Sequence, residues 1–295
     1  MNQAAIKKLS NTRAIAPAAL GFALLVLLPI LALGAPAPKD GAKAKAWAGK
    51  KRDWKGELGD KDRMKRRRAA AEAGRLRDKG AGPALRQRLG DSDPGVRREA
   101  ASALGVLGDG GAALELERAL GDSDPSVRYS AIRALGLTGA QGSAAALAAR
   151  ARGQDAAERA LALEALARLG TEESLSPVIE AARGADPAAA AEACRALQWD
   201  ADDAGLEALK AALERPEETV RAAAAFTLAR RGRADLAGAP ALELLGSPAK
   251  AVRAEAAQAA ALAGPEARAA LSAMREAETD PWVRSVIDAS LARRP

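Results

Sequence analysis

One pattern recurs along most of this chain of 295 residues at a nearly constant interval, and it constrains the fold more than any other feature. Its fullest copies are DSDPGVRREAASALGVLG from Asp91 and DSDPSVRYSAIRALGLTG from Asp122. Seven copies, aligned on the arginine of the motif, follow at steps of 31, 31, 31, 31, 32 and 31 residues. Such regularity is typical of a repeat protein whose units stack on one another. The aligned positions are Arg97, Arg128, Arg159, Ala190, Arg221, Arg253 and Arg284.

Each copy carries the signals that start and end a helix. Asp93 is suited to accept hydrogen bonds from the first free amides of a helix, and Pro94 suits the first helical position, where its missing N–H costs nothing. Gly108 ends the pattern, as expected for a residue that tolerates the left-handed conformation. The apolar residues between them recur on one helical face. They are Val96, Ala100, Leu104 and Leu107.

A shorter apolar pattern precedes each of these helices, as at Leu114, Leu116 and Leu120, so the repeating unit is a pair of helices. Upstream, MKRRRAAAEAGRL from Met64 to Leu76 aligns one period before the first full copy and predicts a helix that covers the end of the stack. Residues 61–295 are therefore predicted to form an all-α domain. We expect an α-solenoid (superhelix) of about seven helical hairpins plus a degenerate N-terminal capping helix.

The motif D-x-D-P-x-V-R-x-x-A-x-x-A-L-G resembles the HEAT-like repeat of the phycobilin-lyase type, over roughly residues 60 to 295. In HEAT proteins, the aspartate and arginine beside the turn between the two helices form a ladder between repeats. The resemblance therefore implies that these recurring charges are structural, because a catalytic site does not need six copies. The ladder would contain Asp91 or Asp93 with Arg97, Asp122 or Asp124 with Arg128, Asp155 with Arg159, Arg221, Arg253, and Asp280 with Arg284.

Three copies depart from the motif. Copy four has Ala190 in place of the arginine. Copies five and six have two extra residues between Pro216 or Pro248 and the arginine. These departures predict an interruption of the ladder in the middle of the array.

The N-terminal segment indicates export or membrane attachment. Residues 14–33, AIAPAALGFALLVLLPILAL, carry no charge and follow Lys7, Lys8 and Arg13. This run is long enough to span a bilayer, and it also fits a secretory signal with a small-residue cleavage site before Ala35. Residues 1–34 are thus predicted to be a signal peptide or a single membrane anchor. We expect a protein that is exported, periplasmic or extracellular, or anchored to the membrane by residues 14–33.

The six Lys and Arg residues between positions 39 and 52 outnumber those before the apolar run. The positive-inside rule therefore favours cleavage, or else a cytoplasmic solenoid. Residues 35–60 have no helical or strand period and are predicted to be a flexible basic linker. Trp47 and Trp54 within it either touch a membrane surface or a ligand, or fold back on the solenoid.

The charge of the chain is divided between its two parts. Residues 1–90 hold 21 Lys+Arg against 7 Asp+Glu, whereas residues 91–295 hold 24 against 31. A dense basic cluster opens the predicted capping helix and is a candidate contact for a partner, an anionic surface or nucleic acid. Some HEAT-like proteins are DNA glycosylases, but the acidic solenoid and the expected export disfavour nucleic acid. The cluster consists of Arg63, Lys65, Arg66, Arg67 and Arg68.

The side-chain inventory disfavours enzyme chemistry. The chain has no histidine and one cysteine, Cys194, on an alanine-rich helix that favours a core position for the thiol. HEAT-like proteins include the iron-dependent deoxyhypusine hydroxylases, whose metal is held by His-Glu pairs, and the lack of histidine argues against that activity. We predict no catalytic residues, no metal site, no cofactor and no small-molecule substrate.

The function expected from the sequence is a non-enzymatic scaffold or adaptor that binds a protein or peptide partner on the solenoid surface. Two alternatives stay open. One is a lyase-like enzyme or chaperone of the bilin-lyase type, which the resemblance implies. The other is nucleic-acid binding through the basic N-terminal cluster.

Overall fold

The computed structural model describes residues 54–200 and 203–293. The chain divides into two units, Met1–Asp53 and Trp54–Pro295, and the account below concerns the second. Every regular element within the described ranges is a helix. The predicted signal or anchor, residues 14–33, lies outside these ranges. None of the helices in the described part of the chain combines the length and the hydropathy needed to cross a membrane.

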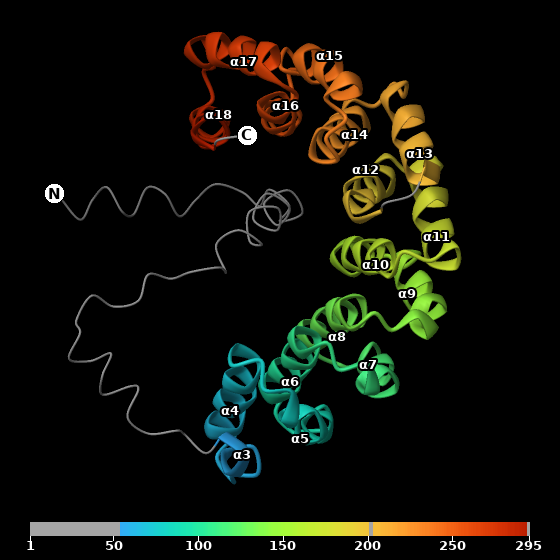
Figure 1. Ribbon diagram of the computed structural model, residues 1–295, viewed down its shortest axis with the longest axis vertical. Helices are drawn as coiled ribbons and strands as arrows, with labels where there is room; N and C mark the ends of the chain where they lie inside the picture. The colour runs from blue at the N-terminus through green and yellow to red at the C-terminus, as the bar shows by residue number, and fades with distance from the viewer. Residues whose placement is uncertain (1–53, 201–202, 294–295) are drawn as a thin grey trace, which may run out of the picture. The chain divides into compact units, whose positions relative to one another are not determined.

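The second helices of the repeats, here called the B layer, pack side by side in one row (Figure 1). Each contacts the B helix before and after it, and α4 begins the row one period upstream, as the predicted capping helix does. These helices are α4 (Arg63–Arg75), α6 (Pro94–Leu107), α8 (Pro125–Thr138), α10 (Ala156–Leu169), α12 (Pro187–Ala196), α14 (Glu218–Arg230), α16 (Lys250–Leu262) and α18 (Pro281–Ala292).

The first helices of the repeats, here called the A layer, form the second row. Each packs on the B helix that follows it, which gives the seven predicted hairpins and confirms the all-α solenoid. They are α5 (Gly82–Arg88), α7 (Ala113–Ala119), α9 (Ala144–Ala151), α11 (Glu172–Arg183), α13 (Asp203–Leu213), α15 (Ala234–Leu244) and α17 (Pro265–Ala277). Short 3-10 turns stand before α5, α7 and α9 and after α12: η2 (Lys79–Ala81), η3 (Gly110–Ala112), η4 (Gln141–Ser143) and η5 (Leu197–Trp199).

The predicted start and stop signals operate as expected. The carboxylate of Asp93 accepts a hydrogen bond from the amide of Val96 at 3.0 Å, and Pro94 occupies the first position of α6. Gly108 ends α6 with a φ of 66°, the left-handed conformation that a side chain disfavours. The apolar face between them packs against the A layer, where Leu104 and Leu116 are fully buried.

Neighbouring B helices approach so closely in the first repeats that only glycine fits at the crossing. A methyl group added to Gly136 of α8 would lie 2.8 Å from Cα of Ala165 in α10, and one added to Gly105 would lie 2.9 Å from Cα of Ala134. Non-bonded carbon atoms are normally 3.5–4.0 Å apart. The repeats therefore stack through backbone contact at these points.

The predicted domain boundary is wrong by several residues. The short helix α3 (Trp54–Glu57) packs on α4, and Trp54 and Leu58 are 7% and 3% exposed. Trp54 folds back on the solenoid because its large apolar surface covers the free side of the first B helix. The helical unit therefore includes residues 54–60, which were assigned to the linker, while Trp47 lies outside the described residues.

Candidate binding surface

A ladder of ion pairs joins successive B helices near their N-termini. Arg97 of α6 donates from Nε and Nη2 to the carboxylate of Asp122 in the next repeat, at 2.6 and 2.7 Å. Its Nη1 donates to the backbone carbonyl of Asp91 at 2.9 Å. Arg66 of α4 makes the equivalent bidentate pair with Asp91 at 2.8 and 2.7 Å. One guanidinium thus ties its own turn to the turn of the following repeat.

The partners expected for the ladder need correction. Arg97 does not pair with the carboxylate of Asp91 or Asp93, because those two oxygen pairs are already engaged by Arg66 and by the N-terminus of α6. The ladder arginines up to Arg253 pair forward, with an acid of the next repeat, whereas Arg284 of the last copy donates to the backbone carbonyl of Glu278 and does not pair with Asp280. The remaining rungs are Arg128 with Glu158, Arg159 with Glu192, Arg221 with Glu243 and Arg253 with Glu278.

The aspartates at the helix N-termini are caps and not rungs. Their carboxylates accept hydrogen bonds from the first amides of their own helix, which orients them along the chain instead of toward the next repeat. This holds for Asp93, Asp124, Asp155 and Asp280. Asp122 and Glu278 each stand six residues before the motif arginine of their own copy, and this recurring position could have identified them as rung acids from the sequence. Glu158, Glu192 and Glu243 stand at other positions and gave no periodic signal.

Two of the rung acids, Asp122 and Glu278, are held in their charged form. Hydrogen bonds from Arg97 lower the pKa of Asp122 below its usual value, and those from Arg253 lower the pKa of Glu278 in the same way. A charge-assisted, partly buried pair of this kind stabilises the junction between two repeats. In the described residues, these charged side chains therefore hold successive repeats together, which is the structural role that the resemblance implied.

Copy four lacks a ladder arginine, as Ala190 predicted. A contact that runs in the reverse direction, from an arginine of the next repeat back to copy four, takes its place and is here called the reversed rung. Arg215 occupies the position that Asp122 holds in copy two. Its Nη1 donates to the carbonyl of Gly184 at 2.7 Å, and Gly184 lies six residues before Ala190. In copy two, Arg128 binds the carbonyl of Asp122 in the same way from within the repeat. The downstream repeat therefore supplies the cation that copy four lacks.

The two-residue insertions change how α14 and α16 begin. The proline now stands before the helix instead of at its first position. The N-cap residues, Glu217 and Ala249, make no side-chain capping bond, because the carboxylate of Glu217 is bound by Arg215 and alanine has no acceptor. Arg253 of copy six still makes a complete rung. Arg221 of copy five lies 3.3 Å from Glu243, whose side chain is 72% exposed, so this rung is weak.

The basic cluster on α4 is neutralised by carboxylates of the same unit. Arg66 is buried in the first rung of the ladder. The other four cations each lie within ion-pair distance of an acid, so the cluster offers little net charge to an anionic surface or partner. The distances are 3.4 Å for Arg63 and Asp93, 3.0 Å for Lys65 and Asp60, 3.6 Å for Arg67 and Glu99, and 3.5 Å for Arg68 and Glu57.

The B helices have one face that is turned away from the A layer, here called the free face. In α6, Arg98, Ser102 and Val106 follow at intervals of four residues on the side opposite Ala100 and Leu104, which are fully buried. Because the repeats are in register, the same three positions in every copy contribute to this face.

The last of these positions forms what we call the terminal row. Seven large apolar side chains are exposed in the described residues, and four of them occupy this single position, at exposures between 41% and 43%. In the three other copies the row has an arginine. Its members are Val106, Leu137, Arg168, Trp199, Arg230, Leu262 and Arg293.

The centre of the terminal row is an aromatic and cationic cluster. The guanidinium of Arg168 stacks on the ring of Trp199, 3.5 Å from its centroid, and is held there by Glu164 at 2.9 Å. In the next repeat, Arg230 lies over the ring of Phe226 at 5.8 Å. Both are cation–π contacts, and they fix the arginines without burying them.

An ion pair crosses the free face between α12 and α16. Arg195 of α12 makes a bidentate pair with Glu255 of α16, at 2.7 Å for both contacts, across the intervening helix α14. Ala222 and Ala223 of α14 are fully buried, although both positions belong to the side turned away from the A layer. The pair therefore closes the free face over α14 and leaves the first repeats more open.

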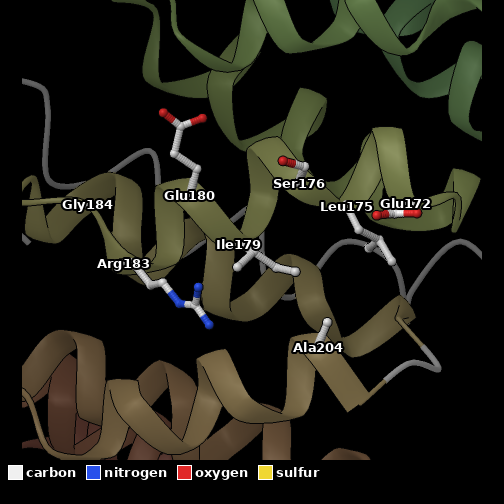
Figure 2. A pocket seen from close by; sticks show the side chains of 8 residues that line it. All are labelled: Glu172, Leu175, Ser176, Ile179, Glu180, Arg183, Gly184 and Ala204. Carbon is white, nitrogen blue, oxygen red and sulfur yellow. The ribbon is translucent and has the colours of Figure 1, made fainter.

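An open hollow of about 740 Å³ lies on the A layer, between α11 and the start of α13. Its lining includes Leu175 and Ile179, and the charged side chains of Glu180 and Arg183 project from opposite sides of α11 (Figure 2). These two charged groups do not converge on a common point (Figure 2).

The described residues contain no group of three or more potential metal ligands. Cys194 is buried in α12, and burial raises the pKa of its thiol to about 12, which keeps it protonated. Tyr129, on the free face, donates to Asp155 at 3.2 Å and is half-buried. Its phenol is thus occupied by a contact between repeats.

Several solved structures are similar to this chain in fold. The complex of CpcE and CpcF of phycocyanin lyase from Nostoc is 22% identical, with 81% of this chain and 93% of that chain covered at a TM-score of 0.47. Human deoxyhypusine hydroxylase in complex with glycerol is 22% identical, with coverage of 81% and 93% and a TM-score of 0.36. YibA of E. coli is 16% identical, with coverage of 88% and 98% and a TM-score of 0.45.

No curated protein matches the chain in sequence. The model of HEAT repeats matches residues 54–136, 111–167, 144–229 and 206–292, which together span the whole described unit. This chain belongs to the HEAT repeat family.

Proposed function

We propose that this protein is a non-enzymatic scaffold or adaptor that binds a protein or peptide segment along the free face of the B layer. The observation that carries the proposal is the terminal row, in which Val106, Leu137, Trp199 and Leu262 expose apolar surface at one position of the repeat. A soluble surface gains nothing from a regular line of exposed apolar side chains, whereas an interface does. Tryptophan and arginine, which share the row, are the residues that most often dominate binding energy.

The choice of a binder over an enzyme rests on the chemistry available. The repeated Asp, Glu and Arg side chains are engaged in rungs and caps, and the chain has no histidine. The alternative, a lyase-like enzyme or chaperone of the bilin-lyase type, has the repeat resemblance as its support, and a shared fold does not transfer an activity. Tight, stoichiometric binding of a bilin by the purified chain, with a change in its absorbance, would favour that alternative.

The place of action is proposed from the sequence of the N-terminal segment. The uncharged run at residues 14–33 supports export or membrane anchorage, so the partner is expected at a membrane or beyond it. Fractionation of the native protein with N-terminal sequencing distinguishes a cleaved signal from an anchor. A full-length protein in the soluble cytoplasmic fraction contradicts this part of the proposal.

Site-specific photocrosslinking in the full chain tests the binding surface. A photoreactive amino acid replaces Leu137 or Leu262 in the terminal row, and Leu114 serves as the matched control because it is 67% exposed on α7 of the A layer. We expect the same partner to be crosslinked from both row positions and not from position 114. A partner crosslinked from Leu114 and from neither row position would refute the assignment of the face.

A further inference from the structure

We propose that the segment bound by the free face is acidic and extended, and that two of its carboxylates pair with Arg133 of α8 and Arg230 of α14. This inference rests on the proposed function, since it names the chemistry of the partner for the same surface. It is drawn from the distribution of charge, from the arginines left available, and from the spacing between them.

The charge of the free face is opposite to that of the solenoid as a whole. The three aligned positions of the face, those of Arg98, Ser102 and Val106 in the first copy, hold six arginines and one glutamate over seven copies. They hold no lysine and no aspartate, whereas residues 91–295 carry 24 basic and 31 acidic side chains in total. Arginine is the cation whose planar guanidinium matches a carboxylate in a bidentate pair. The face is therefore complementary to an acidic polypeptide.

Three of the six arginines are in no ion pair within residues 54–200 and 203–293, and all three are exposed, namely Arg133, Arg230 and Arg293. Arg293 lies beyond the end of α18, so Arg133 and Arg230 are the two that stand within B helices. Stacking on Phe226 orients Arg230 but leaves its donors free for a ligand. Three others on the face are engaged, namely Arg98 with Glu99 at 2.6 Å, Arg168 with Glu164 at 2.9 Å and Arg195 with Glu255 at 2.7 Å.

The positions of the two arginines set the spacing of the acids in the partner. The helices α8 and α14 are separated by three steps along the B layer, and packed helices lie about 8–10 Å apart, so the span is roughly 24–30 Å. An extended chain advances about 3.3 Å per residue, which places the two carboxylates roughly seven to nine residues apart. Trp199 of the terminal row belongs to the repeat between α10 and α14, and it is the anchor for an apolar side chain of the same segment.

The same surface fits a polypeptide better than a nucleic acid. Val106, Leu137 and Leu262 are aliphatic, and they can cover apolar side chains but cannot stack on bases as aromatic residues do. The glutamates at 164 and 255 would lie beside any phosphate backbone that followed the face, and they repel it. A polypeptide can place uncharged residues beside these glutamates and its carboxylates at Arg133 and Arg230, whereas a nucleic acid carries a phosphate at every nucleotide.

Fluorescence anisotropy with the full chain tests this proposal. The probes are labelled serine-rich peptides with a central leucine and two glutamates, whose separation is varied from about four to about twelve residues around the spacing derived above. We expect the tightest binding at a separation of seven to nine residues, and a loss of affinity as salt concentration rises. In the double variant Arg133→Gln and Arg230→Gln, the dissociation constant should increase by at least about tenfold.

The matched control is the double variant Arg118→Gln and Arg183→Gln, which removes two exposed arginines from the A layer and should leave the affinity unchanged. Equal binding of the peptides to both double variants, or no dependence on acid spacing, overturns the proposal. Arginine-dependent binding of oligothymidylate without binding of the peptides also overturns it. If photocrosslinking from Leu137 still captures a partner while the acidic peptides fail, the proposed scaffold stands and only its acidic ligand is rejected.

Discussion

Adding one methyl group at Gly136 tests whether the B helices stack through backbone contact. On helix propensity alone, Gly136→Ala in the middle of a repeat should stabilise α8 by about 1 kcal/mol. The structure predicts the opposite sign, because the added Cβ would lie 2.8 Å from Cα and 2.9 Å from Cβ of Ala165 in α10. Backbone atoms cannot move aside as the end of a flexible side chain can, so the helices must separate.

The magnitude follows from a matched substitution. Gly238 lies inside α15, and a methyl group there would have its nearest neighbours at 3.9 Å, an ordinary van der Waals distance. Gly238→Ala should therefore gain the helix-propensity term of about 0.5–1 kcal/mol without a clash. Overpacking costs about 1–3 kcal/mol, so Gly136→Ala should be less stable than Gly238→Ala by that amount.

Urea unfolding followed by far-UV circular dichroism measures the two variants beside the unmodified chain. The comparison uses midpoints at an unchanged slope, since a repeat array can lose cooperativity when one junction weakens. We expect a lower midpoint for Gly136→Ala and an unchanged or higher one for Gly238→Ala. If both variants are stabilised to the same extent, the close approach of α8 and α10 is refuted.

Three further predictions concern the ladder and the core. Asp122→Asn should lower the free energy of unfolding by about 1.5–3 kcal/mol at neutral pH, because it weakens the charge-assisted bonds from Arg97. The pKa of Asp122 is lowered by folding, so its stabilisation is complete above the unfolded value of 3.8 and is lost as the pH falls below it; urea midpoints of wild type and variant should converge there. Arg215→Met should increase hydrogen exchange at the start of α12 by removing the donor to Gly184, and equal exchange in both proteins would contradict the reversed rung. Cys194 should resist a thiol reagent in the native chain and react on unfolding, whereas rapid native labelling would contradict its burial.

The sequence specified the repeat almost completely because each signal acts locally. The capping by Asp93, the helix end at Gly108 and the apolar face between them involve residues within one helix, and the period repeats them often enough to align all copies. The ladder partners were predicted incorrectly because a rung joins two repeats. Periodicity alone cannot tell whether Arg97 pairs within its copy or with Asp122 of the next one.

The terminal row was not predicted from the sequence, for a different reason. A position that is free of packing constraints varies from copy to copy, so valine, leucine, arginine and tryptophan at one register give no motif. The row becomes visible only when exposure is known, because the same residue types fill the core at neighbouring positions. For Trp199, the sequence alone does not tell a side chain that fills a junction from one that lines a surface; its 41% exposure and the stacked Arg168 place it on the surface.

The ion pair between Arg195 and Glu255 explains why the open part of the free face lies before α14. It joins two helices that are not neighbours in the stack, so the intervening helix must present side chains small enough to pass beneath it. The alanines at 222 and 223 meet that requirement and are fully buried. A polypeptide that follows the terminal row is thereby kept to the outer edge of this crossing, where Trp199 and Arg230 are exposed. If the proposed partner binds the free face, this ion pair confines it to the path along the terminal row.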